Sequence, residues 1–143
     1  MKNILVTGGA GFIGSHAVVE LHNAGFRPVI IDNFVNSERS VIANLEKIIS
    51  DKLSFYEGDF QDIELLQDVA DKESIDGVIH FAAHKAVGES VEKPLKYYSN
   101  NVAGLVTLLE FIEKRKISNL VFSSSCTVYG ETSKLPLTEK SPV

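Results

Sequence analysis

The sequence predicts an α/β fold built on a doubly wound parallel sheet of about five strands. Short apolar runs alternate with longer helical patterns along the 143 residues. Such alternation is typical of parallel strands that are joined by right-handed helical crossovers. In addition, glycines at Gly8, Gly11 and Gly14 directly follow the first apolar run and precede a helical pattern. That order predicts a strand, a tight turn and a helix start.

The elements follow in order from these patterns. The expected strands are residues 3–7, 28–31, 53–56, 77–80 and 119–123, and the expected helices are residues 12–24, 37–50, 63–72 and 94–116. Pro28 and Pro94 suit the start of an element, and Gly25 suits the end of a helix. Residues 131–143 have prolines and no sustained period, so we expect a loop there. All 143 residues are assigned to one domain.

Composition excludes several classes of protein. The hydrophobic fraction is 44% and the net charge is −5, without a basic stripe, so we expect a globular protein that does not bind nucleic acid. Cys126 is the only cysteine, which suits a reducing cytoplasm. No segment suits a signal peptide or a membrane span. The histidines, His16, His22, His80 and His84, lack metal-ligand partners in the sequence, so we expect no metal.

The glycine turn has the chemistry of a dinucleotide site. Its spacing is G-x-x-G-x-x-G, a variant of the G-x-G-x-x-G fingerprint, and alone it is weak evidence. Asp32 ends the second apolar run about 18 residues after Gly14, close to the ~20 expected for a carboxylate that binds a ribose. The other interpretation is a plain glycine turn between strand and helix, with Asp32 capping a loop.

Polar or small residues follow the other strands as well. The pairs Asp32-Asn33 and Gly58-Asp59, the run from Ala82 to Lys85 and the serines 123–125 come at strand ends. The carboxyl ends of parallel strands lie along one edge of an open sheet, where ligands bind. Five separate signals therefore converge on one predicted crevice.

Six longer motifs in the chain are similar to those of a known protein family. They are TGGAGFIGSH from Thr7, DNFVNS from Asp32, GDFQD from Gly58, HFAAHKAVGES from His80, YYSNNVAG from Tyr97 and SSSCTVYG from Ser123. With them the chain resembles the extended short-chain dehydrogenase/reductase family, which has a Rossmann-type NAD-binding domain. Within that family it is most similar to the UDP-glucose (UDP-galactose) 4-epimerases. The resemblance spans nearly the whole chain.

The resemblance implies a role for individual residues in binding NAD. The glycine turn and the N–H groups of Phe12 and Ile13 would meet the pyrophosphate. Further cofactor contacts are implied for Asp32, Asn33, Asn36 and Ser37 at the adenosine ribose, for Asp59 and Phe60 at the adenine, and for Phe81, Ala82, Ala83 and Lys85 along the path to the nicotinamide ribose. Asn100 would face the cofactor from its helix. Lys85 is also implied at the substrate, and Ser125 would hydrogen-bond the reacting oxygen of the sugar.

Several of these residues have a simpler interpretation. Asp59 could cap the following helix, Lys85 could be a solvated loop lysine, and Asn100 could be a polar residue on a helix surface. Asp32 favours NAD over NADP because a carboxylate repels a 2′-phosphate; the next arginine is Arg39, seven positions on. His84 stands where the family often has an apolar residue, and we assign it no role.

The catalytic pair of the family is missing from the chain. The resemblance implies a tyrosine base and a lysine one helical turn later, as Tyr-x-x-x-Lys, and places this pair beyond the SSSxTVYG stretch. Tyr129 has Ser133 at the required spacing, and Lys134 is one residue too far. We therefore expect residues 1–143 to be the N-terminal part of the NAD-binding domain, without the later strands and the substrate domain, and to be inactive alone.

The whole enzyme would interconvert UDP-galactose and UDP-glucose by transient oxidation at C4 with bound NAD. One alternative is another nucleotide-sugar member of the family, although dehydratases place acid–base carboxylates where Cys126 and Thr127 stand. Another is a non-catalytic NAD-sensing module. A homodimer is also expected, because the 94–116 helix is apolar on more than one face, although burial against the sheet would explain the same pattern. Its apolar residues are Val102, Leu105, Val106, Leu108, Leu109, Phe111 and Ile112.

Overall fold

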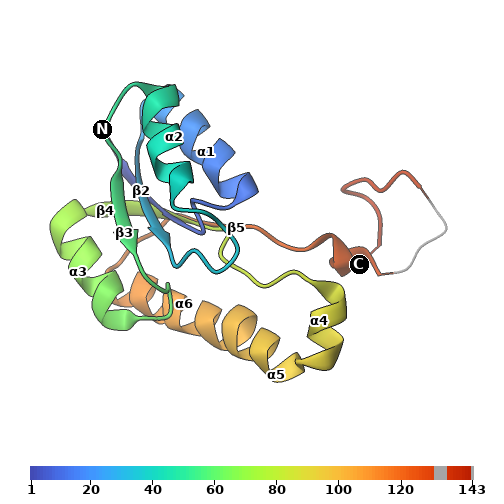
Figure 1. Ribbon diagram of the computed structural model, residues 1–143. Coiled ribbons are helices and arrows are strands. Elements are labelled where there is room, and N and C mark those ends of the chain that lie inside the picture. Colours follow the sequence, from blue (N-terminus) through green and yellow to red (C-terminus); the bar gives the residue numbers. More distant parts are fainter. Residues whose placement is uncertain (131–134, 143) are drawn as a thin grey trace.

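Five parallel strands form the centre of the protein, as the sequence predicts. In the computed structural model, which describes residues 1–130 and 135–142, the strand order is β3-β2-β1-β4-β5 (Figure 1). The strands are β1 (Asn3–Thr7), β2 (Arg27–Asp32), β3 (Ser54–Glu57), β4 (Ile75–His80) and β5 (Leu120–Phe122). The order reverses direction after β3, so β1 and β4 lie side by side at the point where ligands bind in sheets of this type.

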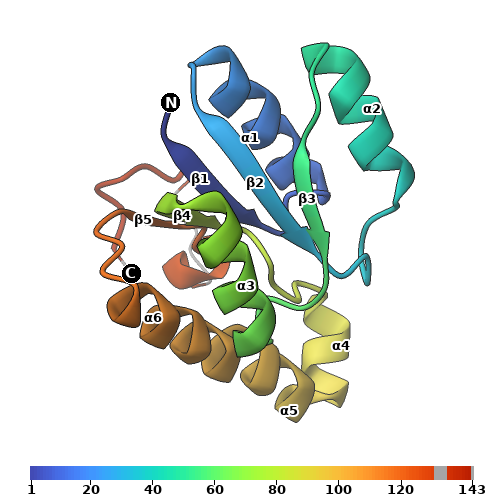
Figure 2. The same cartoon turned by 90° about the vertical axis from the view of Figure 1, so that its left-hand side faces the viewer.

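Helices cover both faces of the sheet. On one face lie α1 (Phe12–Asn23) and α2 (Ser40–Ile49), and on the other lie α3 (Ile63–Glu73) and α6 (Gly104–Lys114) (Figures 1 and 2). Two short helices, α4 (Val87–Glu92) and α5 (Pro94–Tyr97), and a π-helical segment, Tyr98–Ala103, lead into α6. Among the described residues no helix has the length and apolar character to cross a bilayer.

The core has one hydrophobic cluster on each face. Val6 and Ile30 point towards Val18 of α1 and Leu45 of α2. Their strand neighbours point the other way, because successive side chains of a strand face opposite sides. The second cluster comprises Leu5, Val29, Ile31, Phe60, Leu66, Val69, Val78, Leu108, Phe111 and Ile112. This double burial explains why the strands are continuous apolar runs.

The helices over residues 37–116 differ most from the prediction, whereas the strand bounds differ by at most two residues. The helix expected over residues 37–50 begins only at Ser40, because the Ser37 hydroxyl donates to Asp32 at 2.8 Å and holds the preceding loop against the sheet. The helix expected over residues 94–116 is divided by the π-helical segment and ends at Lys114. Helix α4 was not expected; its short, glycine-containing sequence lacks a strong helical period, and Glu89 ties it to Lys96 of α5 at 2.8 Å.

Candidate functional site

The glycine turn after β1 packs directly against the end of β4. Gly8 has a φ of +72°, which favours glycine, and a Cβ on it would lie 2.7 Å from the amide nitrogen of Ala82. At Gly14, a Cβ would overlap the carbonyl oxygen of Gly8. These two glycines therefore let the first turn of α1 come down onto the turn itself. The N–H groups of that first turn have no acceptor within the helix, and Phe12 and Ile13 stand exposed at its start.

Asp32 ties the glycine turn to the end of β2. Its Oδ2 accepts from the amide of Ala10 at 2.9 Å, and its Oδ1 accepts from the amide of Phe34 at 2.9 Å and from the hydroxyl of Ser37 at 2.8 Å. The side chain is buried. A carboxylate has about four acceptor positions, so these three donors leave room for one further hydroxyl. Asp32 thus organises its loop, as the simpler interpretation held, and can still take part in a ribose site.

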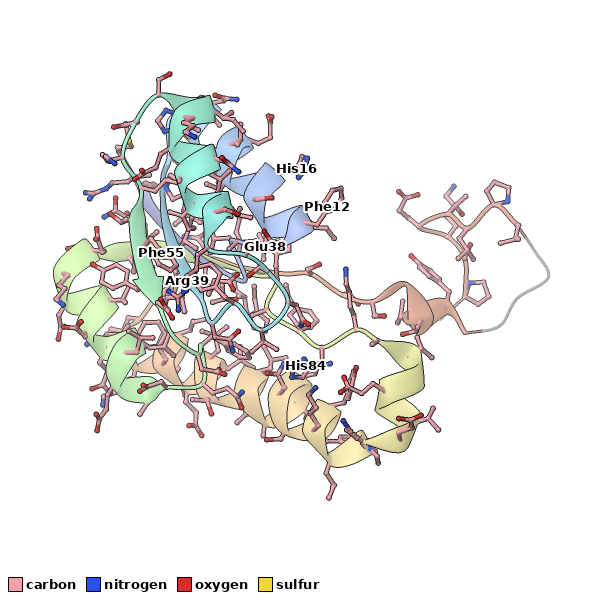
Figure 3. All side chains as sticks on the ribbon, in the orientation of Figure 1. Phe12, His16, Glu38, Arg39, Phe55 and His84 are labelled. Atoms are coloured by element: carbon pink, nitrogen blue, oxygen red, sulfur yellow. The ribbon has the colours of Figure 1, made fainter. Side chains whose placement is uncertain are left out.

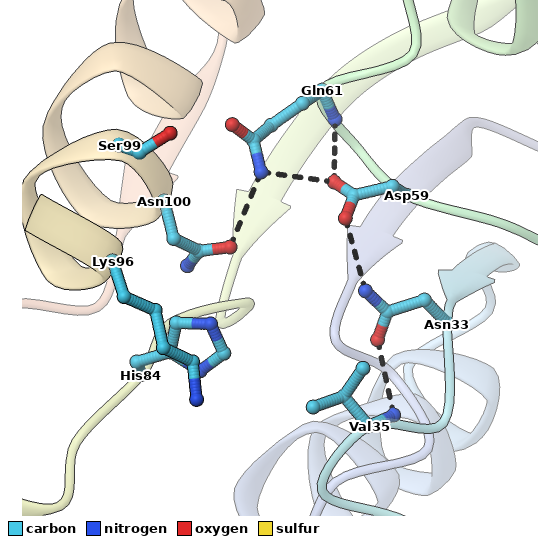
Figure 4. A pocket seen from close by; sticks show the side chains of 8 residues that line it. All are labelled: Asn33, Val35, Asp59, Gln61, His84, Lys96, Ser99 and Asn100. Carbon is cyan, nitrogen blue, oxygen red and sulfur yellow. Dashed lines mark hydrogen bonds between the residues drawn. The ribbon is translucent and has the colours of Figure 1, made fainter. Parts of the chain in front are cut away.

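A chain of hydrogen bonds joins the ends of β2 and β3 to the π-helical segment (Figure 4). Asn33 donates to Asp59 Oδ2 at 3.0 Å, and the side-chain amide of Gln61 donates to Asp59 Oδ1 and to Asn100 Oδ1, each at 3.3 Å. Asn100 in turn donates to Asn101 at 2.9 Å. These groups border a cavity of about 310 Å³, which is lined by Asn33, Val35, Asp59, Gln61, His84, Lys96, Ser99 and Asn100.

Asp59 and Asn100 therefore do not have the simpler roles considered for them. The cap of α3 is Asp62, which accepts from the amides of Glu64 and Leu65 at 3.0 and 3.1 Å. Asp59 instead faces the cavity and fixes its own turn by accepting from the amide of Gln61 at 2.9 Å. Asn100 is part of the hydrogen-bonded chain and is half-buried. The structure brings both residues to the crevice that the strand ends predicted.

An asparagine of the π-helical segment holds the loop after β4. Asn101 accepts from the amide of His84 at 2.9 Å and donates to the carbonyl of the same residue at 2.8 Å. At the start of this loop the amide of Phe81 donates to the Thr7 carbonyl at 2.9 Å. The loop thereby runs beside the glycine turn, with Ala82 half-buried and Ala83 and Lys85 exposed. The ring of His84 lines the cavity and lies 5.5 Å from the Tyr97 ring.

Lys96 and Glu89 set the charge at the far wall of the cavity. Lys96 Nζ lies 2.8 Å from Glu89, and the Tyr97 hydroxyl donates to the same carboxylate at 3.0 Å. The hydrogen bond from Lys96, and then that from Tyr97, lower the pKa of Glu89 to about 2. Glu89 is thus ionised at pH 7, and its negative charge lies against the Lys96 ammonium at the cavity wall.

The aromatic side chains near the site differ in whether they are packed in the core or exposed to a ligand. Phe60 is buried in the core, with its ring 4.8 Å from that of His80. A contact from Phe60 to an adenine would therefore come from its backbone. The Phe81 side chain is also packed against the core, on the α1 and α2 face. Phe12, in contrast, is exposed at the start of α1, beside His16 (Figure 3).

A buried polar pair joins the ends of β1 and β4 beneath the site. The Thr7 hydroxyl and His80 Nδ1 lie 2.6 Å apart, and both residues are buried. Burial lowers the pKa of His80 to about 4, so the imidazole is neutral at pH 7. The pair satisfies two polar groups that would otherwise be costly inside the core.

Ser125 lies apart from the other predicted site residues. Its hydroxyl accepts from the amide of Thr127 at 3.2 Å and caps the short 3-10 helix Cys126–Tyr129. The segment after β5 leads away from the body of the protein (Figure 1), and Ser125 is exposed. Tyr129 ends the 3-10 helix, whereas Ser133 lies outside the described residues, as does Lys134. Asn36 is exposed in the loop after β2.

Three site residues were missed by sequence reasoning. Gln61 connects Asp59 to Asn100, Asn101 holds the His84 backbone, and Gly9 allows the close approach of Ile30, whose Cγ2 would lie 2.8 Å from a Cβ there. Gly9 could have been found, because it stands inside the glycine turn. The two amides could not, because Gln61 reaches Asn100, 39 residues later, and Asn101 reaches His84, 17 residues earlier. Among the described residues no group of three histidine, cysteine or acidic side chains could hold a metal ion.

The family model described as GDP-mannose 4,6 dehydratase matches residues 5–143 of the chain. Among curated proteins, a UDP-glucose 4-epimerase of Neisseria meningitidis is 50% identical over 143 residues, which is all of this chain and 42% of that protein. UDP-glucose 4-epimerase 2 of Arabidopsis thaliana is 48% identical and aligns with 99% of this chain and 41% of its own length. The chain therefore spans less than half the length of the curated relatives that it matches.

Solved structures match over the same share. A UDP-glucose 4-epimerase from Stenotrophomonas maltophila, with bound NAD and formylated UDP-arabinopyranose, has a TM-score of 0.93 at 42% identity, covering 99% of this chain and 42% of that one. A UDP-glucose 4-epimerase from Bifidobacterium longum, in complex with NAD+ and UDP, has a TM-score of 0.93 at 44% identity and the same coverage. These matches confirm the resemblance drawn from the motifs and the fold class predicted from the strand pattern.

Proposed function

The chain belongs to the GDP-mannose 4,6 dehydratase family, and from this premise we propose that it is the N-terminal, NAD-binding part of a UDP-glucose 4-epimerase. The later strands and the substrate domain would lie in the part of the relatives that the chain does not match. The observation that supports this best is the joint geometry of the glycine turn and Asp32. The carboxylate holds the Ala10 amide and keeps one acceptor position for a ribose hydroxyl.

The residues present fit NAD at three places. The first-turn N–H groups of α1 and the positive end of its dipole suit a pyrophosphate. Asp32 suits a ribose with a free 2′-hydroxyl, because a 2′-phosphate beside its carboxylate would be repelled. The cavity of about 310 Å³ offers the Asp59 carboxylate and the Asn33 amide to an adenine. The remaining proposed contacts, from Asn36, Ser37, Phe81, Ala82, Ala83, Lys85 and Asn100, lie along the same edge of the sheet.

Titration of the chain with NAD+ by isothermal calorimetry tests cofactor binding. We expect saturable binding of NAD+ and a much lower affinity for NADP+. Substitution of Asp32 by Asn should weaken NAD+ binding by about tenfold or more, since one good hydrogen bond to a charged acceptor corresponds to at least that factor. Equal affinity for both cofactors would contradict the assignment of Asp32, and no binding at all would contradict the proposal.

In the proposed reaction, bound NAD supplies the hydride acceptor for C4 of a UDP-hexose. The chain contributes orientation of the cofactor along the strand ends and the hydroxyl of Ser125, which would hydrogen-bond the reacting oxygen of the sugar. Lys85, exposed on the loop after β4, would face the substrate side. The tyrosine base and its lysine partner are not found in this sequence, so residues 1–143 alone should not interconvert UDP-galactose and UDP-glucose.

A chimera tests this reaction. Residues 1–143 are joined to the complementary part of the Neisseria meningitidis epimerase, and conversion of UDP-galactose to UDP-glucose is followed. We expect turnover by the chimera and none by the chain alone. A matched chimera with Ser125→Ala should lose about 10²-fold or more in kcat, in the range of a lost hydrogen bond to developing charge. An intact chimera that binds NAD+ but does not turn over would favour an NAD-sensing module.

We also propose a homodimer of the whole protein through helices α4 to α6. Leu108, Phe111 and Ile112 are buried against the sheet, so burial accounts for one face of the expected stripe. The other face remains exposed, and it comprises Val91, Leu95, Tyr98, Val102, Val106 and Leu109. An apolar stripe at this spacing suits a helix–helix interface. Sedimentation should give a dimer that Leu95→Glu converts to a monomer.

A cytoplasmic location, proposed from the cysteine usage, is checked by cell fractionation.

A further inference from the structure

The loop between β2 and α2 carries Arg39, which is labelled in Figure 3. Two different groups hold its side chain. Both terminal nitrogens of Arg39 donate to the two carboxylate oxygens of Glu57, as a bidentate pair. The guanidinium carbon also lies 5.0 Å from the centre of the Phe34 ring. That ring in turn lies 5.4 Å from the ring of Phe55 in β3. The position of Arg39 is therefore set by a carboxylate and an aromatic face together.

The carboxylate partner stands next to the proposed ribose site. In the register of β2 and β3, Glu57 is paired with Asp32. Neighbouring strands lie about 4.8 Å apart, so the two residues occupy adjacent positions at the same edge of the sheet. Arg39 is thus a cation on the same loop as Phe34 and Ser37, both of which donate to Asp32. It is held against the strand next to the proposed ribose carboxylate.

An arginine in this neighbourhood would ordinarily suit a 2′-phosphate. The planar guanidinium binds a phosphate through the same two parallel N–H groups that it gives to a carboxylate. Here one N–H of each terminal nitrogen is given to Glu57, so the carboxylate occupies this fork of the guanidinium. A phosphate that approaches the same fork must compete with that carboxylate and also with the negative charge of Asp32.

We propose that Glu57 is a specificity-determining residue, which withholds Arg39 from a 2′-phosphate and so adds to the preference for NAD over NADP. The inference rests on the proposed function, because it refines the ribose end of the same site. The Arg39–Glu57 pair is exposed to solvent, with side-chain exposures of 68% and 43%, so it is weak enough for a single substitution to release Arg39.

The test compares affinities for NADP+ and NAD+ in the full chain. Glu57→Gln keeps the size of the side chain and removes its charge. We expect NADP+ to bind about three- to fivefold more tightly than it binds the unaltered chain, because breaking an exposed ion pair can return no more affinity than the pair itself is worth. Affinity for NAD+ should change by less than about twofold, because Asp32 is unaltered. The NADP+ gain should shrink at high salt, since the pair is exposed.

Two further variants separate this explanation from a simple loss of charge. Adding Arg39→Gln to Glu57→Gln should abolish the gain in NADP+ affinity, because the arginine itself is the group released. Asp68→Asn removes a carboxylate from another exposed pair, with Lys72 at 2.6 Å on α3, and should leave both affinities unchanged. Thermal unfolding of each variant checks that the fold is kept.

The outcomes distinguish a failure of the role proposed for Glu57 from a failure of the proposed NAD-binding function. If NAD+ binds but Glu57→Gln leaves NADP+ affinity unchanged, the inference is overturned and the proposed function stands. If the double variant retains the gain, repulsion by Glu57 rather than release of Arg39 is responsible, and the inference is again overturned. If the unaltered chain binds neither cofactor, the proposed function itself fails.

Discussion

The carboxyl ends of β2 and β5 lie at the same edge of the sheet, but the chain packs them very differently. β2 has a strand on either side and helices over both faces, and Asp32 at its end is 8% exposed with three donors around its carboxylate. Among the residues that the structure describes, β5 pairs only with β4, and its Val121 is 59% exposed. The end of β2 is fixed by contacts within the described chain. The end of β5, which leads to Ser125, has few such contacts and is exposed.

This difference separates the two halves of the proposed chemistry. The groups assigned to the cofactor are held by hydrogen bonds and close packing that the chain itself supplies. Ser125, assigned to the substrate, caps a short exposed helix on a segment that leads away from the body. We therefore expect substitutions near β2 to affect folding and NAD+ binding together, and substitutions near β5 to have small effects on both.

The largest expected effect is at the glycine turn. Gly14→Ala places a Cβ on the Gly8 carbonyl oxygen, which is backbone and cannot move aside cheaply. We expect a loss of at least about 3 kcal/mol in the free energy of unfolding, in the range of overpacking plus backbone displacement. Urea denaturation measures it. Gly88→Ala, where nothing lies within 4 Å, is the matched control and should be neutral or slightly stabilising. Equal losses in both would contradict the close packing.

The next effect is a pH dependence of the free energy of unfolding, which arises from His80 at the end of β4. Because its pKa is lowered from 6.5 to about 4, the unfolded state binds a proton that the folded state does not. The free energy of unfolding should therefore fall as the pH drops from about 6.5 to about 4, by up to about 3 kcal/mol, and lose no more from this group below that. His80→Gln should flatten this part of the pH profile relative to the unaltered chain.

A control for the histidine effect is His16→Gln, at an exposed position on α1. Its pH profile between about 4 and 6.5 should match that of the unaltered chain. If His80→Gln also left the profile unchanged, the neutral buried imidazole would not be the source of the pH dependence.

A smaller effect is expected when Asp32 loses one acceptor. In Asp32→Asn the side chain keeps one oxygen, and its NH₂ group must face a donor that the carboxylate accepted. We expect a loss of about 2 kcal/mol in the free energy of unfolding, the cost of leaving a buried donor unsatisfied. Asp62→Asn is the matched control, because Asn serves almost as well as Asp at a helix N-cap. Equal melting temperatures for the two variants would contradict this account.

The smallest effect is expected for a substitution in β5, measured beside the same substitution in β2. Val29→Ala in β2 removes methyl groups from a fully buried position and should cost about 2–3 kcal/mol. Val121→Ala in β5, at a half-exposed position, should cost less than about 1 kcal/mol. Denaturation of both variants in parallel gives the difference directly. Similar costs would mean that β5 is covered in solution, for example by a second copy of the chain.

Much of the fold could be read from local patterns. The five apolar runs, the glycine turn and the end of α1 near Gly25 follow from periodicity and from backbone preferences within a few residues. The division of the 94–116 helix could not be predicted, because its apolar period continues through the π-helical segment. Likewise, the resemblance implies an adenine contact for Phe60, and only the packing of its ring against His80 reveals that its side chain belongs to the core.

By itself, the sequence determined which residues gather at the carboxyl edge of the sheet, because parallel strands place their ends together whatever their side chains do next. Only the tertiary structure decided which of these groups pair. Gln61 meets Asn100, Asp32 meets the Ala10 amide, and Arg39 meets Glu57. Each pair joins different elements, and its geometry depends on strand register and helix packing over long separations. Neither strand register nor helix packing can be predicted from local sequence patterns.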